Sequence, residues 1–353
     1  MIAQLCNSHG FFHGWAATQY HHEVFRAIVT QIEEHYTGNC IVVDDTWISK
    51  IANEETFVKM YPNVMRENVE HIFFVNSVDS SSDCAAENDY HEILQQLTTA
   101  RHRHRITVNS KFQFWAYFCQ QEFWQHYASP GQPDYPWTGE ELFLSYNRKP
   151  IVHRTKLIEA LRNHDLLRRG IVTLGNDDPT QALTVKENLE VTDGDAYGNV
   201  GIPNDITSLG NHNIWQEAFI NVVTETLTHG EFLSEKIWKP IIGKRPFFLI
   251  GPPGSLQKLR DLGFKTFQGF WDESYNELVT PSLRHKNQLS EDASIEQVCL
   301  FLNELDEFPL STMKALYHEM ASILEYNYKH FFETFAMENR ARMDTIIQDE
   351  LNG

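Results

Sequence analysis

The residues best suited to chemistry stand in the second half of the chain, where Glu235 and Lys236 are neighbours at the expected start of a helix. Unpaired backbone N–H groups and the helix dipole favour an anion at such a position, and Lys236 adds a full positive charge. A carboxylate beside it is suited to accept hydrogen bonds from a pair of sugar hydroxyls. The pair therefore predicts one contact to a ribose and one to a diphosphate. A solvated helix start is the structural alternative for these two residues alone.

A second polar segment is expected to reach the same ligand. The pattern predicts a strand over 141–146 and a helix over 154–162 with one apolar face. In an open parallel sheet, ligands bind beyond the carboxyl ends of the strands, so the loop between these two elements should face the crevice. Simple surface charge is the alternative role for Arg148. The residues of this segment expected to contact the ligand are Asn147, Arg148 and Arg154.

The stretch 222–251 resembles the donor-binding motif of GT-B glycosyltransferases, and its pattern is similar to that of the α1,3-fucosyltransferases. The positions that match this motif are Glu225, Phe232, Ser234, Glu235 and Lys236. Thr226 stands where that family has Asn, and Phe232 lacks the hydroxyl of the family's Tyr. The resemblance therefore leaves the base of the nucleotide open. By its place just inside the helix, Arg154 matches the Arg that contacts the donor pyrophosphate in that family.

A second resemblance, over residues 143–274, is to uncharacterised glycosyltransferase-like proteins of microbes and large viruses. The two resemblances imply an α/β fold of the GT-B type, with two Rossmann-like domains whose parallel sheets face a cleft and with C-terminal helices that pack back on the first domain. They imply transfer of a sugar from a GDP- or UDP-sugar to an acceptor hydroxyl. Glu235 would then hold the ribose, Lys236 and Arg154 the diphosphate, and Glu225 either the sugar or the loop that shapes its pocket.

The organisation of the chain agrees with two domains. Its 353 residues are many for one hydrophobic core and natural for two α/β domains. Alternating strand and helix patterns predict an N-terminal, acceptor-side domain over 1–128, and a stretch rich in Pro and Gly predicts a linker over 129–139. The nucleotide-sugar-binding domain is expected over 140–308, and long C-terminal helices over 309–353.

The catalytic base is expected to come from the first domain, across the cleft from the donor. The candidates are Asp45, after an expected strand at 41–43, and His13 in the first loop, with Asp79 as a further possibility. Asp44 and Asp45 could instead form the metal site of a GT-A enzyme, although adjacent carboxylates point apart on an extended chain. The structural alternatives are a helix cap for the aspartates and an ordinary loop histidine for His13.

The sequence predicts no metal site and no required cofactor, because no spacing of His and Cys suits a metal and because Lys236 and Arg154 can stabilise the leaving group. The five cysteines contain no Cys-x-x-Cys pair, and residues 1–15 do not resemble a secretion signal. These features predict a cytoplasmic protein, in the host cytoplasm if the protein is viral. No apolar run is long enough to span a bilayer. Gly-x-Gly-x-x-Gly and P-loop motifs are absent, which weakens a dehydrogenase or ATPase assignment.

The formal net charge of −19 disfavours a nucleic-acid partner overall, but residues 101–170 hold 11 Lys or Arg against 6 Asp or Glu. The basic run 101–105 is either a solvated basic turn or an acceptor-side patch for an anionic polymer, such as DNA or an acidic glycan. In the second case the acceptor contacts are Arg101, Arg103 and Arg105. The acceptor remains open between a glycan and a hydroxymethylated base of viral DNA. The rival function is a non-catalytic nucleotide- or nucleic-acid-binding protein on the same fold.

Overall fold

Contacts within the computed structural model divide the chain into two compact units, residues 1–118 with 336–353 and residues 119–335. The domain boundaries expected from the sequence remain predictions. The structure describes residues 2–4, 28–30, 32–34, 36–44, 69–76, 102–107, 116, 120, 136–147, 150–174, 183–184, 209, 212–228, 233–277 and 287–352.

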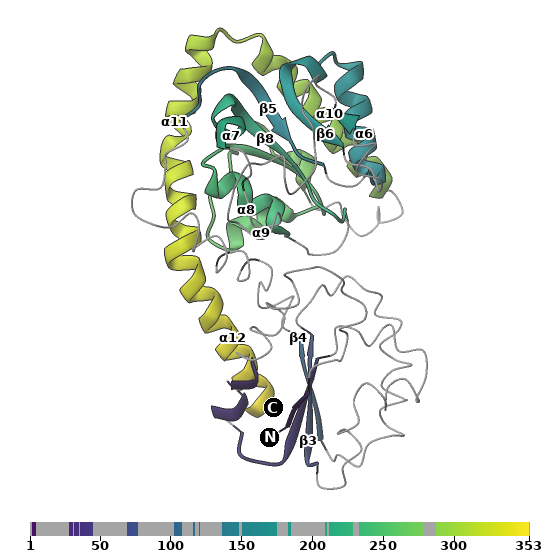
Figure 1. The fold of residues 1–353 in the computed structure, drawn as a ribbon, viewed down its shortest axis with the longest axis vertical. Helices are drawn as coiled ribbons and strands as arrows, with labels where there is room; N and C mark the ends of the chain where they lie inside the picture. The colour runs from purple at the N-terminus through teal and green to yellow at the C-terminus, as the bar shows by residue number, and fades with distance from the viewer. Residues whose placement is uncertain are drawn as a thin grey trace. The chain divides into compact units, whose positions relative to one another are not determined.

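The first unit contains a four-stranded sheet in which every neighbouring pair of strands is parallel (Figure 1). The side chains of Val42, Ile72 and Phe73 in its central strands are completely buried. Runs of apolar residues of this kind are typical of parallel strands, which are covered on both faces. The strands stand in the order β1 (Ile2–Gln4), β2 (Cys40–Asp44), β3 (His71–Asn76) and β4 (His102–Thr107).

The basic run near residue 101 does not form the turn that we considered for it. His102–Thr107 is strand β4, which pairs in parallel with β3 from His71 to Asn76. The interpretation as a turn was wrong because alternating His and Arg give no strand signal of their own, whereas the backbone edge of β3 supplies hydrogen-bonding partners. An acceptor role for Arg103 and Arg105 stays a prediction, and Arg101 lies outside the described residues.

The second unit contains a five-stranded sheet whose strands are all parallel except β7. From β5 the chain moves to β6 on one side and then crosses to β8 on the other side of β5. Such a reversal of strand order is a topological switch point, and in open α/β sheets it is where ligands bind. The order is β7 (Leu183–Thr184), β6 (Gly170–Leu174), β5 (Glu141–Ser145), β8 (Ala218–Thr224) and β9 (Phe247–Ile250).

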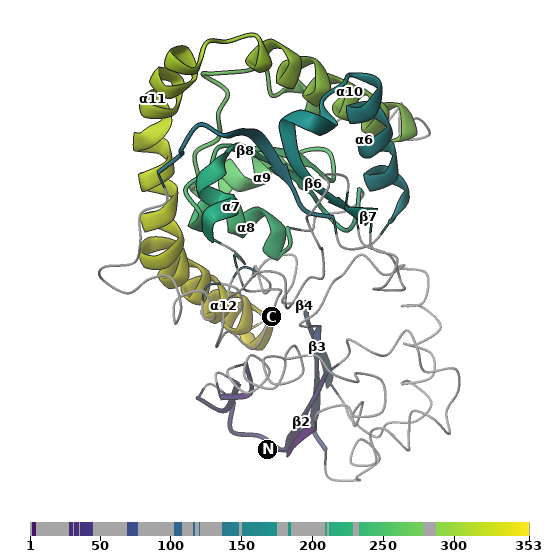
Figure 2. The same cartoon turned by 45° about the horizontal axis from the view of Figure 1, so that its top comes forward.

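Helices flank this sheet on both sides. In Figures 1 and 2, α6 and α10 lie side by side, while α7 and α8 lie on the other side of the sheet. Lys156 of α6 forms ion pairs with Glu291 at 3.4 Å and Asp292 at 2.7 Å on α10. The α-helices described in this unit are α6 (Val152–Asn163), α7 (His212–Glu217), α8 (Glu235–Ile242), α9 (Ser255–Asp261), α10 (Asn287–Asp306) and α11 (Leu310–Lys329). Helix α12 (Phe335–Asn352) belongs, apart from its first residue, to the first unit.

The end of α11 is fixed to the loop that follows α9. The side-chain amide of Asn327 accepts a hydrogen bond from the backbone N–H of Lys265 and donates one to its carbonyl, both at 2.8 Å. His330 hydrogen-bonds the Leu262 carbonyl at 2.8 Å. Beyond this point the ring of Phe331 stacks on Trp238 of α8, with ring centroids 5.4 Å apart. These contacts pack the end of α11 and the residues after it against α8 and the loop after α9.

The α/β class expected from the sequence is confirmed. None of the described helices is long and apolar enough to cross a membrane.

Candidate functional site

The carboxyl ends of three adjacent strands are joined by hydrogen bonds to Asn147, the second residue after β5. Its backbone N–H donates to the hydroxyl of Thr173 on β6 at 3.0 Å, and its side-chain oxygen accepts from the hydroxyl of Thr224 on β8 at 2.6 Å. Its amide nitrogen donates to the hydroxyl of Ser145 at 3.1 Å. Asn147 is 1% exposed. It therefore fixes the spacing of the strand ends at the switch point rather than presenting a free amide.

Glu225, the first residue after β8, holds the start of α8 in place. One carboxylate oxygen accepts a hydrogen bond from the backbone N–H of Ser234 at 3.0 Å, and the other accepts one from the Ser234 hydroxyl. Ser234 is the N-cap of α8, and its hydroxyl oxygen also accepts from the backbone N–H of Lys236 at 3.3 Å. The carboxylate of Glu225 thus supplies an acceptor to the N-cap residue, which in turn supplies one to the helix.

Glu235 and Lys236 lie in the first turn of α8, directly beyond this cap. The ammonium of Lys236 is 2.5 Å from a carboxylate oxygen of Glu235 and donates to the Ser234 hydroxyl oxygen at 3.2 Å. The two side chains are mostly buried, with 22% of Lys236 and 16% of Glu235 exposed. Among the predicted donor residues, this pair combines opposite charges, a helix N-terminus and access to solvent.

The first turn of α6 approaches the same strand ends. His153 is buried, and its Nε2 lies 2.7 Å from the carbonyl oxygen of Glu225, so the N–H of Nε2 donates to it. Arg154 is 2% exposed and donates from Nη2 to the Thr224 carbonyl at 3.3 Å. Residues from α6 therefore hold the backbone at the end of β8. The side chain of Arg154 is more deeply buried than the sequence indicated.

Strand β9 completes the surroundings of Glu225. The backbone N–H of Glu225 donates to the carbonyl of Ile250 at 2.8 Å. A Cβ placed on the following residue, Gly251, would come within 3.1 Å of the Glu225 Cγ atom. Glycine at this position therefore leaves room for the buried carboxylate side chain.

The electrostatics of the two glutamates differ. Burial raises the pKa of Glu225, although Lys236 and the hydrogen bonds from Ser234 oppose that change. Burial also acts to raise the pKa of Glu235, but the charge and hydrogen bond of Lys236, together with Lys239, lower it below its usual value. Burial lowers the pKa of His153, which favours the neutral imidazole. Glu235 is accordingly the ionised partner of Lys236 at neutral pH.

The structure brings six of the predicted donor-site residues to one edge of the sheet: Asn147, Arg154, Glu225, Ser234, Glu235 and Lys236. The other predicted positions lie outside the described residues or, for two arginines of β4, have side chains outside them. Those outside are Arg148, Phe232, Asp45, Asp79, His13 and Arg101, and the two arginines are Arg103 and Arg105.

Sequence reasoning did not single out Thr173 or Ser145. A signal for both exists, because each is a hydroxyl residue near the end of an otherwise apolar strand. A buried hydroxyl needs a hydrogen-bonding partner, and here the backbone and side chain of Asn147 provide one.

Within the part of the chain that the structure describes, no group of three or more His, Cys, Asp or Glu side chains could hold a metal ion. Comparison with models of protein families and with curated proteins found no match to this chain. The arrangement of the site residues is consequently the basis of the functional argument.

Proposed function

We propose that this protein is a glycosyltransferase of the GT-B type that moves a sugar from a GDP- or UDP-sugar to an acceptor hydroxyl. The observation that carries the proposal is the Glu235–Lys236 pair at the start of α8, next to the switch point of a parallel sheet. Ligands of open α/β sheets bind at such a point, and anions bind at helix N-termini.

The proposed binding mode uses the two charges separately. Lys236 contacts Glu235 and Ser234, and both contacts can be exchanged for phosphate oxygens, which are charged acceptors for an ammonium group as the carboxylate is. When Lys236 exchanges part of its contact with Glu235 for phosphate oxygens, the Glu235 carboxylate can accept hydrogen bonds from two ribose hydroxyls. A nucleoside diphosphate offers both groups in one molecule, whereas inorganic phosphate or a nucleoside offers only one.

The buried residues then have supporting roles. Glu225 sets the position of Ser234 and hence of Lys236, which favours the second of the two roles considered for it, shaping the loop around the donor. Asn147 fixes the strand ends. Arg154 donates a hydrogen bond to the Thr224 carbonyl and contributes a buried positive charge to the site. A charge in a low-dielectric interior acts over a longer range than one in water, so Arg154 can favour a leaving diphosphate.

The proposed chemistry also needs a base for the acceptor hydroxyl, and Asp45 and His13 remain the candidates. The leaving diphosphate is stabilised by Lys236, Arg154 and the N–H groups at the start of α8, so the proposed reaction requires no metal. A glycan and a hydroxymethylated DNA base remain the two acceptor classes, and the proposed site of action is the cytoplasm.

Release of nucleoside diphosphate tests this function. The full chain is incubated with GDP- and UDP-sugars, with glycans or hydroxymethylated DNA as acceptor, and free GDP or UDP is measured. We expect release with one donor and a decrease of about tenfold or more in Lys236→Ala, the loss expected for a charge-assisted contact. Lys314→Ala, a change at an exposed lysine on α11, serves as the control. If the folded protein binds a donor but releases no diphosphate with any acceptor, it is a non-catalytic nucleotide-binding protein instead.

A further inference from the structure

A pocket of about 390 Å³ lies between α9, the loop after it and α11. This volume is within the range of small-molecule sites, about 300–1,000 Å³. Of its eight described lining residues, two are cationic and none is acidic. The lining consists of Arg260, Phe264, Lys265, Thr266, Gln268, Gly269, Phe270 and Ile323.

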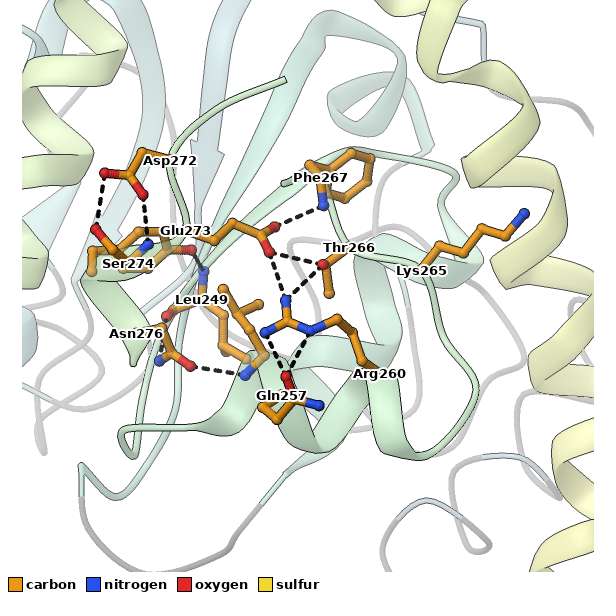
Figure 3. Close-up of polar contacts among 12 residues, drawn as sticks. Leu249, Gln257, Arg260, Lys265, Thr266, Phe267, Asp272, Glu273, Ser274 and Asn276 are labelled. Atoms are coloured by element: carbon orange, nitrogen blue, oxygen red, sulfur yellow. Dashed lines mark hydrogen bonds and ion pairs between the residues drawn. The ribbon is translucent and has the colours of Figure 1, made fainter. Parts of the chain in front are cut away.

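Arg260 is held rigidly at one side of the pocket (Figure 3). Its Nη1 donates to the Thr266 hydroxyl at 2.9 Å and to Glu273 at 2.8 Å, while Nε and Nη2 donate to the side-chain oxygen of Gln257 at 3.1 and 3.0 Å. Four of the five N–H groups of the guanidinium thus have partners, so residues of the chain fix its position.

Glu273 helps to hold the Arg260 guanidinium in this position without a ligand. Its carboxylate accepts hydrogen bonds from Arg260 and from the Thr266 hydroxyl, both at 2.8 Å, and from the backbone N–H of Phe267 at 2.7 Å. The side chain of Glu273 is 6% exposed, against 28% for Arg260. The carboxylate thus lies behind the guanidinium and balances its charge, which leaves a neutral pair at the wall of the pocket.

Lys265 supplies the unbalanced charge. Its side chain extends away from the Arg260 cluster in Figure 3, and its Nζ lies 4.1 Å from the centroid of the Tyr326 ring on α11. Among the described residues, no carboxylate forms an ion pair with Lys265. The apolar part of the lining consists of Phe264, Phe270 and Ile323, beside the uncharged residues Thr266, Gln268 and Gly269. Aromatic and aliphatic walls beside one unbalanced cation suit a ligand with an apolar body and a single negative charge.

We propose that this pocket binds a small aromatic carboxylate. The carboxylate would accept from Lys265, and the ring would lie against Phe264, Phe270 and Ile323. A phosphate group fits less well, because Arg260 is already paired with Glu273 and phosphate is usually bound by a bidentate guanidinium or by several backbone N–H groups. This site is separate from the Glu235–Lys236 pair and does not depend on the glycosyltransferase proposal.

The test uses 4-(trifluoromethyl)benzoate as the probe, with 19F NMR titration of the full chain. The neutral analogue 4-(trifluoromethyl)benzamide controls for apolar binding alone. We expect the benzoate to bind, and Lys265→Gln to weaken it about three- to fivefold, as expected for loss of a partly exposed charge contact. Since Lys265 is exposed and contacts Asn327 only through its backbone, this variant should keep the fold. Lys314→Gln, an exposed lysine of α11 outside the pocket lining, is the charge-matched control.

Gly269 permits a second and independent variant. A Cβ placed on Gly269 meets no atom within 4 Å, so a side chain can be added there without a clash. Gly269→Asp brings a negative charge to the pocket rim and should weaken the benzoate about fivefold, while Gly269→Asn, of the same size but neutral, should change its Kd less than twofold. Absence of benzoate binding would overturn the proposal. Equal binding of the benzamide, or an unchanged Kd in both Lys265→Gln and Gly269→Asp, would overturn it too.

Discussion

Both carboxylate oxygens of Glu225 accept hydrogen bonds from Ser234, one from its backbone N–H and one from its hydroxyl. The residues are nine positions apart, at the end of β8 and at the N-cap of α8. This contact sets where the first turn of α8 begins, and hence where Glu235 and Lys236 stand. The buried carboxylate thus connects the sheet to the partly exposed charges of the candidate site.

Replacement of Glu225 by alanine should destabilise the protein. The backbone N–H of Ser234, a residue that is 1% exposed, would lose its acceptor, and an unsatisfied buried donor costs about 1–3 kcal/mol. Glu225→Gln keeps an oxygen for this N–H and should cost less. Urea unfolding measures the difference, with the exposed Glu159→Ala as control. Equal stability of Glu225→Ala and wild type would show that the contact does not position α8.

The two glutamates should give opposite pH dependence. Because the pKa of Glu225 is raised by burial, the unfolded chain releases this proton first, and wild type should lose stability relative to Glu225→Gln as pH rises above about 4.5. The pKa of Glu235 is lowered, since Lys236 and Lys239 outweigh its burial. The free energy of unfolding of wild type, relative to Glu235→Gln, should therefore increase as pH rises through the acidic range and past the ordinary pKa of a Glu side chain. On acidification this difference should disappear.

Urea unfolding of wild type, Glu225→Gln and Glu235→Gln at a series of pH values from 3 to 8 checks this. The two difference curves should slope in opposite directions. Parallel curves would contradict a raised pKa at Glu225 beside a lowered pKa at Glu235.

A charged side chain in place of Asn147 should lower the free energy of unfolding. Asn147→Asp keeps the shape of the side chain but replaces the amide donor to Ser145 by a carboxylate oxygen and buries a charge at the strand ends. We expect a loss of about 2 kcal/mol or more, since burial of an unpaired polar group costs this much. Asn163→Asp, the same change at an exposed position near the end of α6, should alter the free energy of unfolding by less than about 0.5 kcal/mol. Similar effects at the two positions would refute the buried network.

Much of the second unit could be predicted from the sequence. The apolar runs at 141–146 and 246–251 correspond to β5 and β9, and the periodic pattern at 154–162 falls inside α6. These elements have strong local signals, because parallel strands are continuously apolar and α6 buries one face. Strand β4 could not be predicted in this way, since its pairing with β3 depends on a distant segment rather than on its own residues.

The candidate site could likewise be predicted from the sequence only in part. Neighbouring charges at Glu235 and Lys236 are visible in the sequence, but the depth of each side chain is not. Arg154 and Asn147 stand in a polar loop and helix start, yet they are buried because strand ends on either side of β5 supply their partners. Hydrogen bonds between residues 70 or more positions apart, such as Arg154 to Thr224, follow from strand order, which a local pattern does not contain.

In the proposed function, the Glu235–Lys236 pair binds a nucleoside diphosphate. Thermal unfolding of wild type, Lys236→Ala and the control Lys314→Ala, with GDP, UDP, CDP, ADP or dTDP up to millimolar concentration, tests this binding. A ligand that binds only the folded state stabilises it by about 2.7 kcal/mol at one hundred times its Kd. We expect one diphosphate to raise the Tm of wild type and of Lys314→Ala, and to raise that of Lys236→Ala clearly less at the same concentration. No shift with any diphosphate, or an equal shift in Lys236→Ala, would contradict the proposed binding.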